Sequence, residues 1–296
     1  MKKNKLLIVG CGDIAMRLST LLKMQYHLIG LCRNKGNFEK LRAHGINPIA
    51  GDLDYPASLD RLSGLAHTIV HLAPPSGQGR KDTRTKHLLT ALGRQSKIKT
   101  GILPQQFIYI STSGVYGDCN GNWIDENRTA NPRNERAWRR LDAERQVRNW
   151  GSRHGVRISI LRVPGIYAEN RLPITRLQQQ LPALLEGEDS YTNHIHADDL
   201  ARIIVATLRY GRPGRVYHAC DDSHLKMGEY FDLVADHFGL PRPQRITREQ
   251  AQSAISPGML SFMQESRRLT NLRMKQELRV KLRYPTVSDC LESIAV

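Results

Sequence analysis

Short runs of apolar and β-branched residues alternate with longer stretches of helical periodicity through the first two thirds of the chain. No other feature limits the fold as much, because strand, helix and strand in succession form a parallel sheet covered by helices. We expect strands at residues 5–10, 27–32, 47–50, 68–72, 106–112, 157–163 and 215–220. We expect helices at residues 14–23, 38–44, 83–92, 138–150, 198–208 and 227–238. The sequence therefore predicts an α/β protein with a doubly wound parallel sheet.

The regular alternation breaks after Gly165, where proline-rich turns and short helices take over. One strand and one helix of the regular kind return at residues 192–220. We therefore expect a sheet domain at residues 1–165, with 192–220 returning to it. Residues 166–191 and 221–296 are expected to form a small, mostly helical cap.

The composition is that of an ordinary globular protein. Of the 296 residues, 40% are hydrophobic and 24% are charged, a balance that excludes collagen, coiled-coil and disordered chains. No apolar run approaches the roughly 18 residues that span a bilayer, and residues 6–9 are too short a run for a signal peptide. We expect a cytoplasmic protein without membrane association. The five cysteines are scattered and never paired as C-x-x-C, so neither a disulfide nor a metal site is expected.

The formal charge of +16 is compatible with nucleic acid, acidic lipid headgroups or a phosphorylated small molecule as a partner. The basic residues are spread along the chain, which favours a generally basic surface over a dedicated groove. The sequence contains no recognisable helix-turn-helix, zinc finger or aromatic RNA platform. Nucleic acid is therefore the weaker alternative, and a small-molecule partner is expected.

The strongest motif opens the chain, where the strand ending at Val9 runs into a G-x-G-x-x-A turn. Gly10 permits the sharp turn, Gly12 lets the backbone approach a pyrophosphate, and Ala15 lets the following helix pack on the strand. The phosphates would lie at the helix N-terminus, where free N–H groups favour negative charge. The spacing predicts the dinucleotide turn of a Rossmann fold. The residues expected to bind the cofactor there are Gly10, Cys11, Gly12, Asp13 and Ile14.

The end of the second strand carries the cofactor preference. An NAD site usually has an acid about twenty residues after the glycine turn, to hold the ribose 2′-hydroxyl. Here the chain reads Cys32-Arg33-Asn34, without that acid. A guanidinium suits a 2′-phosphate, so Arg33 favours NADP over NAD; the alternative is a solvated turn.

Motifs further along carry a family resemblance. Gly51-Asp52-Leu53 follows the third strand, the fifth strand reads into Ser111-Thr112-Ser113-Gly114-Val115-Tyr116-Gly117-Asp118, and residues 161–167 and 194–200 add ordered matches. The sequence resembles the extended short-chain dehydrogenase/reductase superfamily, in particular its NAD-dependent epimerase/dehydratase group, over nearly the whole chain. The resemblance implies a Rossmann domain with a C-terminal substrate cap and, often, a sugar nucleotide as substrate. It also makes a homodimer an expectation by analogy.

The same resemblance assigns further site residues. Thr112 takes the place of the family's catalytic Ser/Thr, whose hydroxyl would polarise the substrate oxygen; the alternative is a satisfied hydroxyl at a strand end. The remaining cofactor contacts that it implies are Asp52, Leu53, Ala73, Pro74, Pro164, Gly165 and Ile166.

The chain departs from the family at the Tyr-x-x-x-Lys pair. Counting back from Leu141-Asp-Ala-Glu144 places Arg136 at the tyrosine position and Arg140 at the lysine position. A guanidinium stays protonated, so Arg136 is suited to bind a carboxylate or phosphate and is a poor general base. Other residues with suitable groups are Tyr116, Tyr167, Tyr191 and His196, for each of which structural packing is the favoured interpretation.

Two functional hypotheses follow. The first is an NAD(P)-binding oxidoreductase or epimerase-like enzyme that acts on a polar, anionic small molecule. Either a relocated acid/base or solvent would then supply the proton. The second is a catalytically silent NADP-binding redox sensor or regulatory protein, which the loss of both tyrosine and lysine favours. Arg267, Arg268 and Arg273 are candidates to grip an anionic substrate, or they belong to an exposed basic segment.

Overall fold

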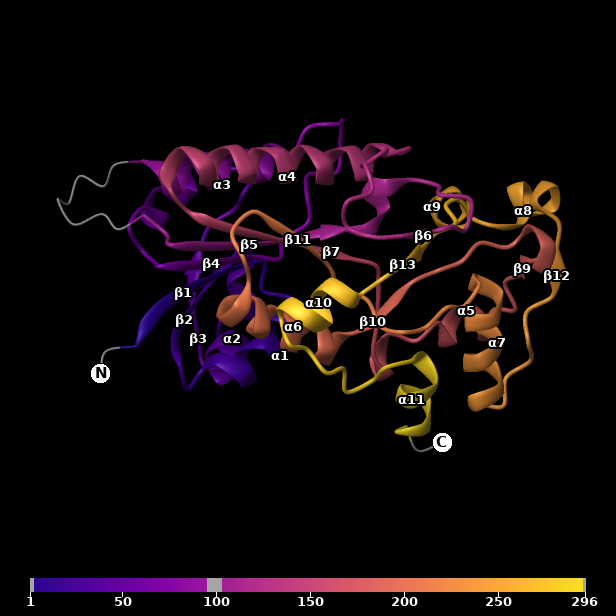
Figure 1. Ribbon diagram of the computed structural model, residues 1–296. Helices are drawn as coiled ribbons and strands as arrows, with labels where there is room; N and C mark the ends of the chain where they lie inside the picture. Colours follow the sequence, from indigo (N-terminus) through magenta and orange to yellow (C-terminus); the bar gives the residue numbers. More distant parts are fainter. Residues whose placement is uncertain (1–2, 95–102, 295–296) are drawn as a thin grey trace.

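A computed structural model describes residues 3–94 and 103–294 of the chain, and it confirms the predicted α/β architecture (Figure 1). Seven parallel strands form the central sheet in the order β11-β7-β5-β4-β1-β2-β3. Every one of them lies within two residues of its predicted bounds. The strands are β1 Asn4–Val9, β2 Tyr26–Cys32, β3 Ile46–Ala50, β4 Thr68–His71, β5 Gln106–Thr112, β7 Arg157–Val163 and β11 Arg215–His218.

Helices cover both faces of this sheet, as Figure 1 shows. On one face lie α3 (Thr83–Gly93) and α4 (Glu135–His154), which pack against each other. On the other face lie α1 (Asp13–Leu22) and α6 (Ala197–Tyr210), also in mutual contact, with α2 (Phe38–Ala43) nearby. The result is the doubly wound arrangement of a Rossmann fold.

The side chains of β1 explain why each face of the sheet is covered by a layer of helices. Leu6 and Ile8 enter one hydrophobic cluster, whereas Leu7 and Val9 enter another, and all four are fully buried. Successive strand residues point to opposite faces, so a continuous apolar run needs a helix layer on each side.

The remaining elements come mostly from residues after β7. Three pairs of very short strands link distant segments: β6 (Trp123–Ile124) with β13 (Arg268–Leu269), β8 (Gly165–Tyr167) with β10 (His194–His196), and β9 (Ala183–Leu184) with β12 (Arg245–Ile246). The short helices are α5 Ile174–Gln178, α7 Met227–His237, α8 Arg248–Ala254, α9 Pro257–Met263, α10 Leu272–Glu277 and α11 Val287–Glu292. The 3₁₀ segments are η1 Lys35–Asn37, η2 Pro56–Leu62, η3 Ser113–Tyr116, η4 Glu169–Arg171 and η5 Glu186–Glu188.

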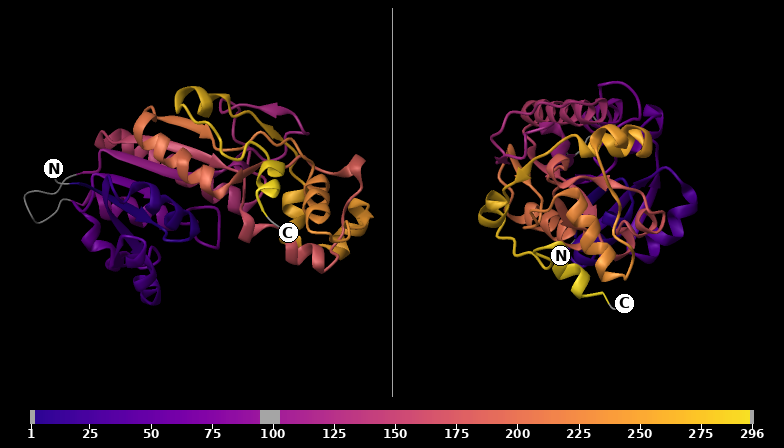
Figure 2. Two further views of the ribbon diagram at one scale, coloured as in Figure 1. Left: turned by 90° about the horizontal axis from the view of Figure 1, so that it is seen from below. Right: turned by 90° about the vertical axis from the view of Figure 1, so that its right-hand side faces the viewer.

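A separate hydrophobic cluster joins several of these later elements. Leu177 of α5, Phe231 of α7 and Met263 of α9 belong to it, together with Tyr167 and Val287. Figure 2 shows α5, α7, α8 and α9 gathered at one end of the molecule, away from the N-terminus. The proposed boundaries of sheet domain and cap stay a prediction.

A buried ion pair holds α4 against the sheet at the edge where the site lies. The Arg162 guanidinium donates to both carboxylate oxygens of Glu144, at 3.0 and 2.8 Å, and the Ser111 hydroxyl donates to the same carboxylate at 2.6 Å. All three residues are buried. Loss of one partner from such a pair leaves an uncompensated buried charge, so this contact fixes α4 relative to β5 and β7.

In the described part of the chain no helix is both long and apolar enough to cross a membrane.

Candidate functional site

Three hollows lie at the carboxyl ends of the parallel strands, where open α/β sheets bind their ligands. The first, here named the glycine-turn cleft, has a volume of about 390 Å³ and is lined by the residues of the turn between β1 and α1. The second-strand cleft, of about 300 Å³, lies beside it at the ends of β2 and β3. The large cavity, of about 750 Å³, lies on the other side.

The two glycines of the turn have different tasks. Gly10 has a φ of +97°, and a Cβ added to it would lie 2.6 Å from the backbone nitrogen of Ala73. Gly12 has an extended backbone, and a Cβ added there would meet no atom within 4 Å. Gly10 is therefore required by the fold, whereas Gly12 keeps the cleft open at the N-terminus of α1.

The second-strand cleft contains one arginine that already has an ionic partner and one that has no partner of that kind. Arg84 binds both carboxylate oxygens of Asp54, at 2.8 and 2.6 Å, and this contact lowers the pKa of Asp54. Arg33 lines the same cleft, is exposed, and makes no ion pair within 4.0 Å among the described residues. Its guanidinium is therefore free to meet an anion.

The structure brings the residues expected to bind cofactor into these hollows. Gly10, Cys11, Gly12, Asp13 and Ile14 line the glycine-turn cleft, Arg33, Asp52 and Leu53 line the second-strand cleft, and Ala73 and Pro74 line both. Pro164 and Ile166 line both the glycine-turn cleft and the large cavity, and Gly165 lines the cavity alone. Their role in binding a cofactor stays a prediction.

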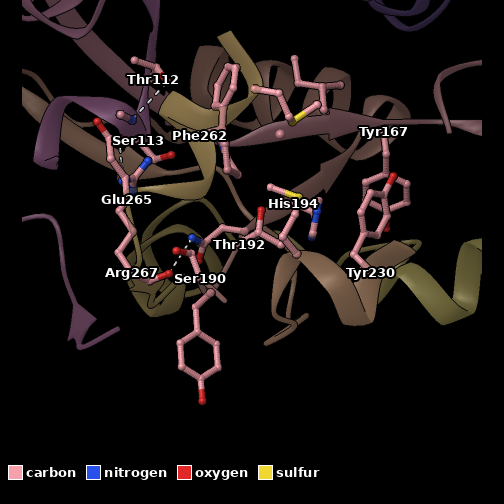
Figure 3. Close-up of a pocket in the computed structure, with 18 of the residues that line it drawn as sticks. Thr112, Ser113, Tyr167, Ser190, Thr192, His194, Tyr230, Phe262, Glu265 and Arg267 are labelled. Atoms are coloured by element: carbon pink, nitrogen blue, oxygen red, sulfur yellow. Dashed lines mark hydrogen bonds and ion pairs between the residues drawn. The ribbon is translucent and has the colours of Figure 1, made fainter. Parts of the chain in front are cut away.

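Thr112 lies where the glycine-turn cleft meets the large cavity, because it lines both. It is the last residue of β5, and its Oγ accepts a hydrogen bond from the backbone N–H of Gly114 at 3.2 Å. Its hydroxyl hydrogen has no acceptor among the described residues, so it can be donated to a ligand oxygen. Figure 3 shows Thr112 and Ser113 on one side of the cavity, with Tyr167 and Tyr230 across from them.

The two arginines at the positions of the missing pair point to different hollows. Arg136 lines the large cavity and its guanidinium lies 3.9 Å from the centre of the Phe262 ring. Arg140, one turn later on α4, lines the glycine-turn cleft and donates to the backbone oxygen of Ile110 at 2.7 Å. Burial and the neighbouring Arg140, Arg139 and Arg267 lower the pKa of Arg136, which Glu265 opposes.

Most residues considered as substitutes for the tyrosine are occupied by structural contacts. The Tyr116 hydroxyl is buried and lies 2.5 Å from Nε2 of His218, and burial raises the pKa of Tyr116 to about 12. The Tyr167 hydroxyl donates to the backbone oxygen of Thr286 at 3.2 Å, and burial raises its pKa as well. His196 caps α6 by accepting from the N–H of Asp198 at 3.2 Å. These three residues therefore serve packing and capping.

The remaining candidate, Tyr191, and His194 line the cavity, as the side chain of Tyr167 also does. Tyr191 lies under the guanidinium of Arg268, 4.5 Å from the ring centre. His194 is buried, and its Nδ1 has no hydrogen-bond partner among the described residues. Burial lowers the pKa of His194 to about 4, so the ring is neutral near pH 7. No cluster of three or more metal-binding side chains occurs in residues 3–94 and 103–294.

The three candidate arginines near the C-terminus lie in different surroundings. Arg267 lines the large cavity, where it donates to Glu265 at 3.0 Å and to the backbone oxygen of Gly117 at 2.8 Å. Arg268 packs between Trp123 and Tyr191. Arg273 donates to the backbone oxygen of Val216, outside the three hollows.

Sequence reasoning missed Glu265 and Phe262, which enter the cavity from the segment around α9. Glu265 accepts from Asn134, the N-cap of α4, at 3.0 Å, and from Arg267 at 3.0 Å. It is buried to 9% side-chain exposure and is the acid among the cavity-lining residues that the structure describes. The signal available in the sequence was an acid two residues before one of the candidate arginines.

Comparisons with known proteins agree with this arrangement. The family described as "NAD dependent epimerase/dehydratase family" matches residues 12–220, which is more than half of the chain. GDP-6-deoxy-D-mannose reductase of Pseudomonas aeruginosa is 29% identical over 206 residues, covering 62% of this chain and 68% of that protein. dTDP-D-glucose 4,6-dehydratase of Homo sapiens is 25% identical over 140 residues, covering 45% of this chain and only 38% of that protein.

Among solved structures, a conserved protein of unknown function from Silicibacter pomeroyi is similar over 98% of both chains, with 28% identity and a TM-score of 0.80.

Proposed function

The chain belongs to the NAD-dependent epimerase/dehydratase family, and on that premise we propose that it is an NAD(P)-dependent oxidoreductase or epimerase that acts on a polar, anionic small molecule such as a sugar nucleotide. The two curated relatives are named for reactions of nucleotide-linked sugars. A catalytically silent NADP-binding protein is the alternative that the experiment below must exclude.

One observation carries the proposal: the glycine-turn cleft adjoins the large cavity. Thr112, Pro164, Ile166 and Arg171 line both hollows. A ligand lying along the glycine turn and a second ligand in the cavity would therefore meet beside the Thr112 hydroxyl. Such a meeting point is what a hydride-transfer reaction between two bound molecules requires.

The residues around the glycine turn fit a dinucleotide. The open space beside Gly12 and the N-terminus of α1 suit a pyrophosphate, because backbone N–H groups face it. Leu53 and Asp52 would border the adenine, and Arg33 would bind the 2′-phosphate of NADP. The chemistry that a bound nicotinamide supplies is the acceptance or donation of a hydride.

The residues around the cavity assign the remaining roles. The Thr112 hydroxyl donates to the reacting substrate oxygen and polarises it. Arg136 stays protonated and cannot exchange the proton that a phenol would. We assign proton transfer to Glu265, the carboxylate among the described residues that line the same cavity.

The test is turnover of a sugar-nucleotide panel with NADP⁺ or NAD⁺, followed by nicotinamide absorbance and by NMR of the sugar. We expect turnover of at least one member. Thr112→Val should lower kcat by about 10² or more, because the polarising hydroxyl is gone. Glu265→Gln should lower kcat by about 10² to 10⁴.

Thr112→Ser is the matched control, since it keeps the hydroxyl and the bond to the Gly114 N–H, and we expect it to retain most of the activity. Dinucleotide binding without turnover of any panel member, or turnover that survives Thr112→Val unchanged, would favour the silent alternative or a different catalytic group.

A further inference from the structure

Arg171 is the cation that the two adjoining hollows share among the described residues. Four other arginines each line one of these hollows: Arg136, Arg176 and Arg267 the large cavity, and Arg140 the glycine-turn cleft. Arg171 lines both. It therefore stands between the places of the two ligands.

The protein holds the side chain of Arg171 only weakly. Arg171 ends the short segment η4, between β8 and α5, and its side chain is 38% exposed. In the described part of the chain its ionic partner is the carboxylate of Asp13, at 3.8 Å. That carboxylate already accepts a hydrogen bond from Arg17 at 3.1 Å. An exposed pair of this kind contributes little to stability, so the Arg171 guanidinium is available to a ligand.

Asp13 fixes where Arg171 stands relative to the dinucleotide. Asp13 is the first residue of α1, directly after Gly12, and the function proposed above puts the pyrophosphate beside this helix end. A carboxylate at this place repels phosphates, and the positive charges of Arg171 and Arg17 offset the repulsion. Arg171 is thus the cation of the cavity wall that lies next to the expected phosphates of the dinucleotide.

The two ligands of the proposed function both carry phosphates, and the same arginine lines the places of both. An arginine side chain loses rotamer freedom when a ligand holds it. The ligand that arrives first bears this entropic cost, and the second ligand finds the guanidinium already ordered. Five N–H donors allow one guanidinium to bind oxygens of two ligands at once.

We propose that Arg171 binds both the dinucleotide and a nucleotide-linked substrate, and that through this shared contact each ligand raises the affinity for the other. Arg171 holds the two ligands beside each other and takes no part in the transfer of hydride or proton. This inference rests on the function proposed above.

The experiment measures the Kd of NADPH without and with a saturating sugar nucleotide, by calorimetry on the full chain. UDP-glucose, GDP-mannose and dTDP-glucose are the probes, because their sugar rings have no carbonyl group that NADPH could reduce. The ratio of the two Kd values measures the coupling, and linkage requires the same ratio when the sugar nucleotide is titrated without and with NADPH. We expect a ratio of about five or more for at least one probe.

Arg171→Gln should lower this ratio to about one or below, because the shared guanidinium is gone and the repulsion between the two anions remains. Arg140→Gln is the comparison within the site. Since Arg140 lines the glycine-turn cleft and not the large cavity, its loss should change the Kd of NADPH and leave the ratio unchanged.

Arg145→Gln is the matched control, since Arg145 is exposed on α4 and lines none of the three hollows. We expect it to leave both the Kd of NADPH and the ratio unchanged. Arg171 and Arg145 are both exposed, so the unfolding midpoints of these two variants should match that of the parent protein.

The outcomes separate the inference from the proposed function. Equal Kd values of NADPH without and with each sugar nucleotide that binds would overturn the coupling and leave the proposed function standing. A ratio that persists in folded Arg171→Gln, or that is lost in Arg140→Gln as well, would overturn the assignment to Arg171. Failure of all three sugar nucleotides to bind would contradict the proposed substrate class and, with it, this inference.

Discussion

Arg33 and Arg84 show how a neighbouring carboxylate decides what an arginine can do. Both line the second-strand cleft, but Asp54 binds Arg84 through two hydrogen bonds. Arg33 has no such partner in the described part of the chain, and it follows the strand at the position where an NAD site usually has an acid. The preference for NADP in the proposed function depends on this one side chain.

Arg33→Ala should therefore raise the Kd of NADPH about tenfold and leave the Kd of NADH within about twofold of the parent value, because only NADPH has the 2′-phosphate. Calorimetric titration at matched salt measures both. Arg42→Ala, which removes an exposed arginine of α2 stacked on Phe38, is the control and should change neither affinity. Equal losses for the two dinucleotides would show that Arg33 does not bind the 2′-phosphate.

At the scale of an element, one face of α4 supplies side chains to three different parts of the site. Arg136, Arg140 and Glu144 lie four residues apart and therefore on one face of the helix. They reach the large cavity, the glycine-turn cleft and the buried Arg162 in turn. The sequence pattern predicts a helix from residue 138, whereas α4 begins at Glu135, because the Asn134 side chain accepts from the Ala137 N–H at 2.9 Å as the N-cap.

The segment after β11 carries a buried acid whose ionisation should affect stability. Burial raises the pKa of Asp221 to about 8, against about 3.9 in an unfolded chain. The folded state thus holds this proton more tightly than the unfolded state. The contribution of Asp221 to the free energy of unfolding is fully present below about pH 4. As the pH rises from there toward 8, the free energy of unfolding falls by at most about 1.4 kcal/mol per pH unit.

Asp221→Asn removes this ionisation, so the variant should gain stability relative to the parent protein as the pH rises from about 5 to about 8. Urea unfolding across that range measures the difference. Asp236→Asn is the control, since Asp236 is exposed and ion-paired with Arg242 at 2.7 Å, and its difference from the parent should stay constant over this pH range. Parallel stability curves for Asp221→Asn and the parent would contradict the buried, protonated carboxyl.

At the scale of the whole molecule, the sheet was predictable and the cavity wall was not. The strands of the sheet are apolar runs with turns at their ends, which is a local signal, and all seven were found. The pairs β6 with β13 and β9 with β12 have two residues per strand, and each joins segments far apart in the sequence. Their formation depends on tertiary contacts, as does the approach of Glu265 and Phe262 to the start of α4. The cofactor turn could therefore be read from the chain, whereas the acid and the ring beside Arg136 could not.

The most direct test of the account is calorimetric titration of NADPH and NADH into the full chain and into Gly12→Val. The Gly12 backbone is extended and a Cβ there meets no atom within 4 Å, so the valine variant should fold with an unchanged unfolding midpoint. The account predicts that the parent protein binds NADPH more tightly than NADH and that Gly12→Val binds neither, because its side chain fills the space for the pyrophosphate. Absence of binding to the parent protein, or equal affinity in a folded Gly12→Val, would contradict the claim that this cleft holds a dinucleotide.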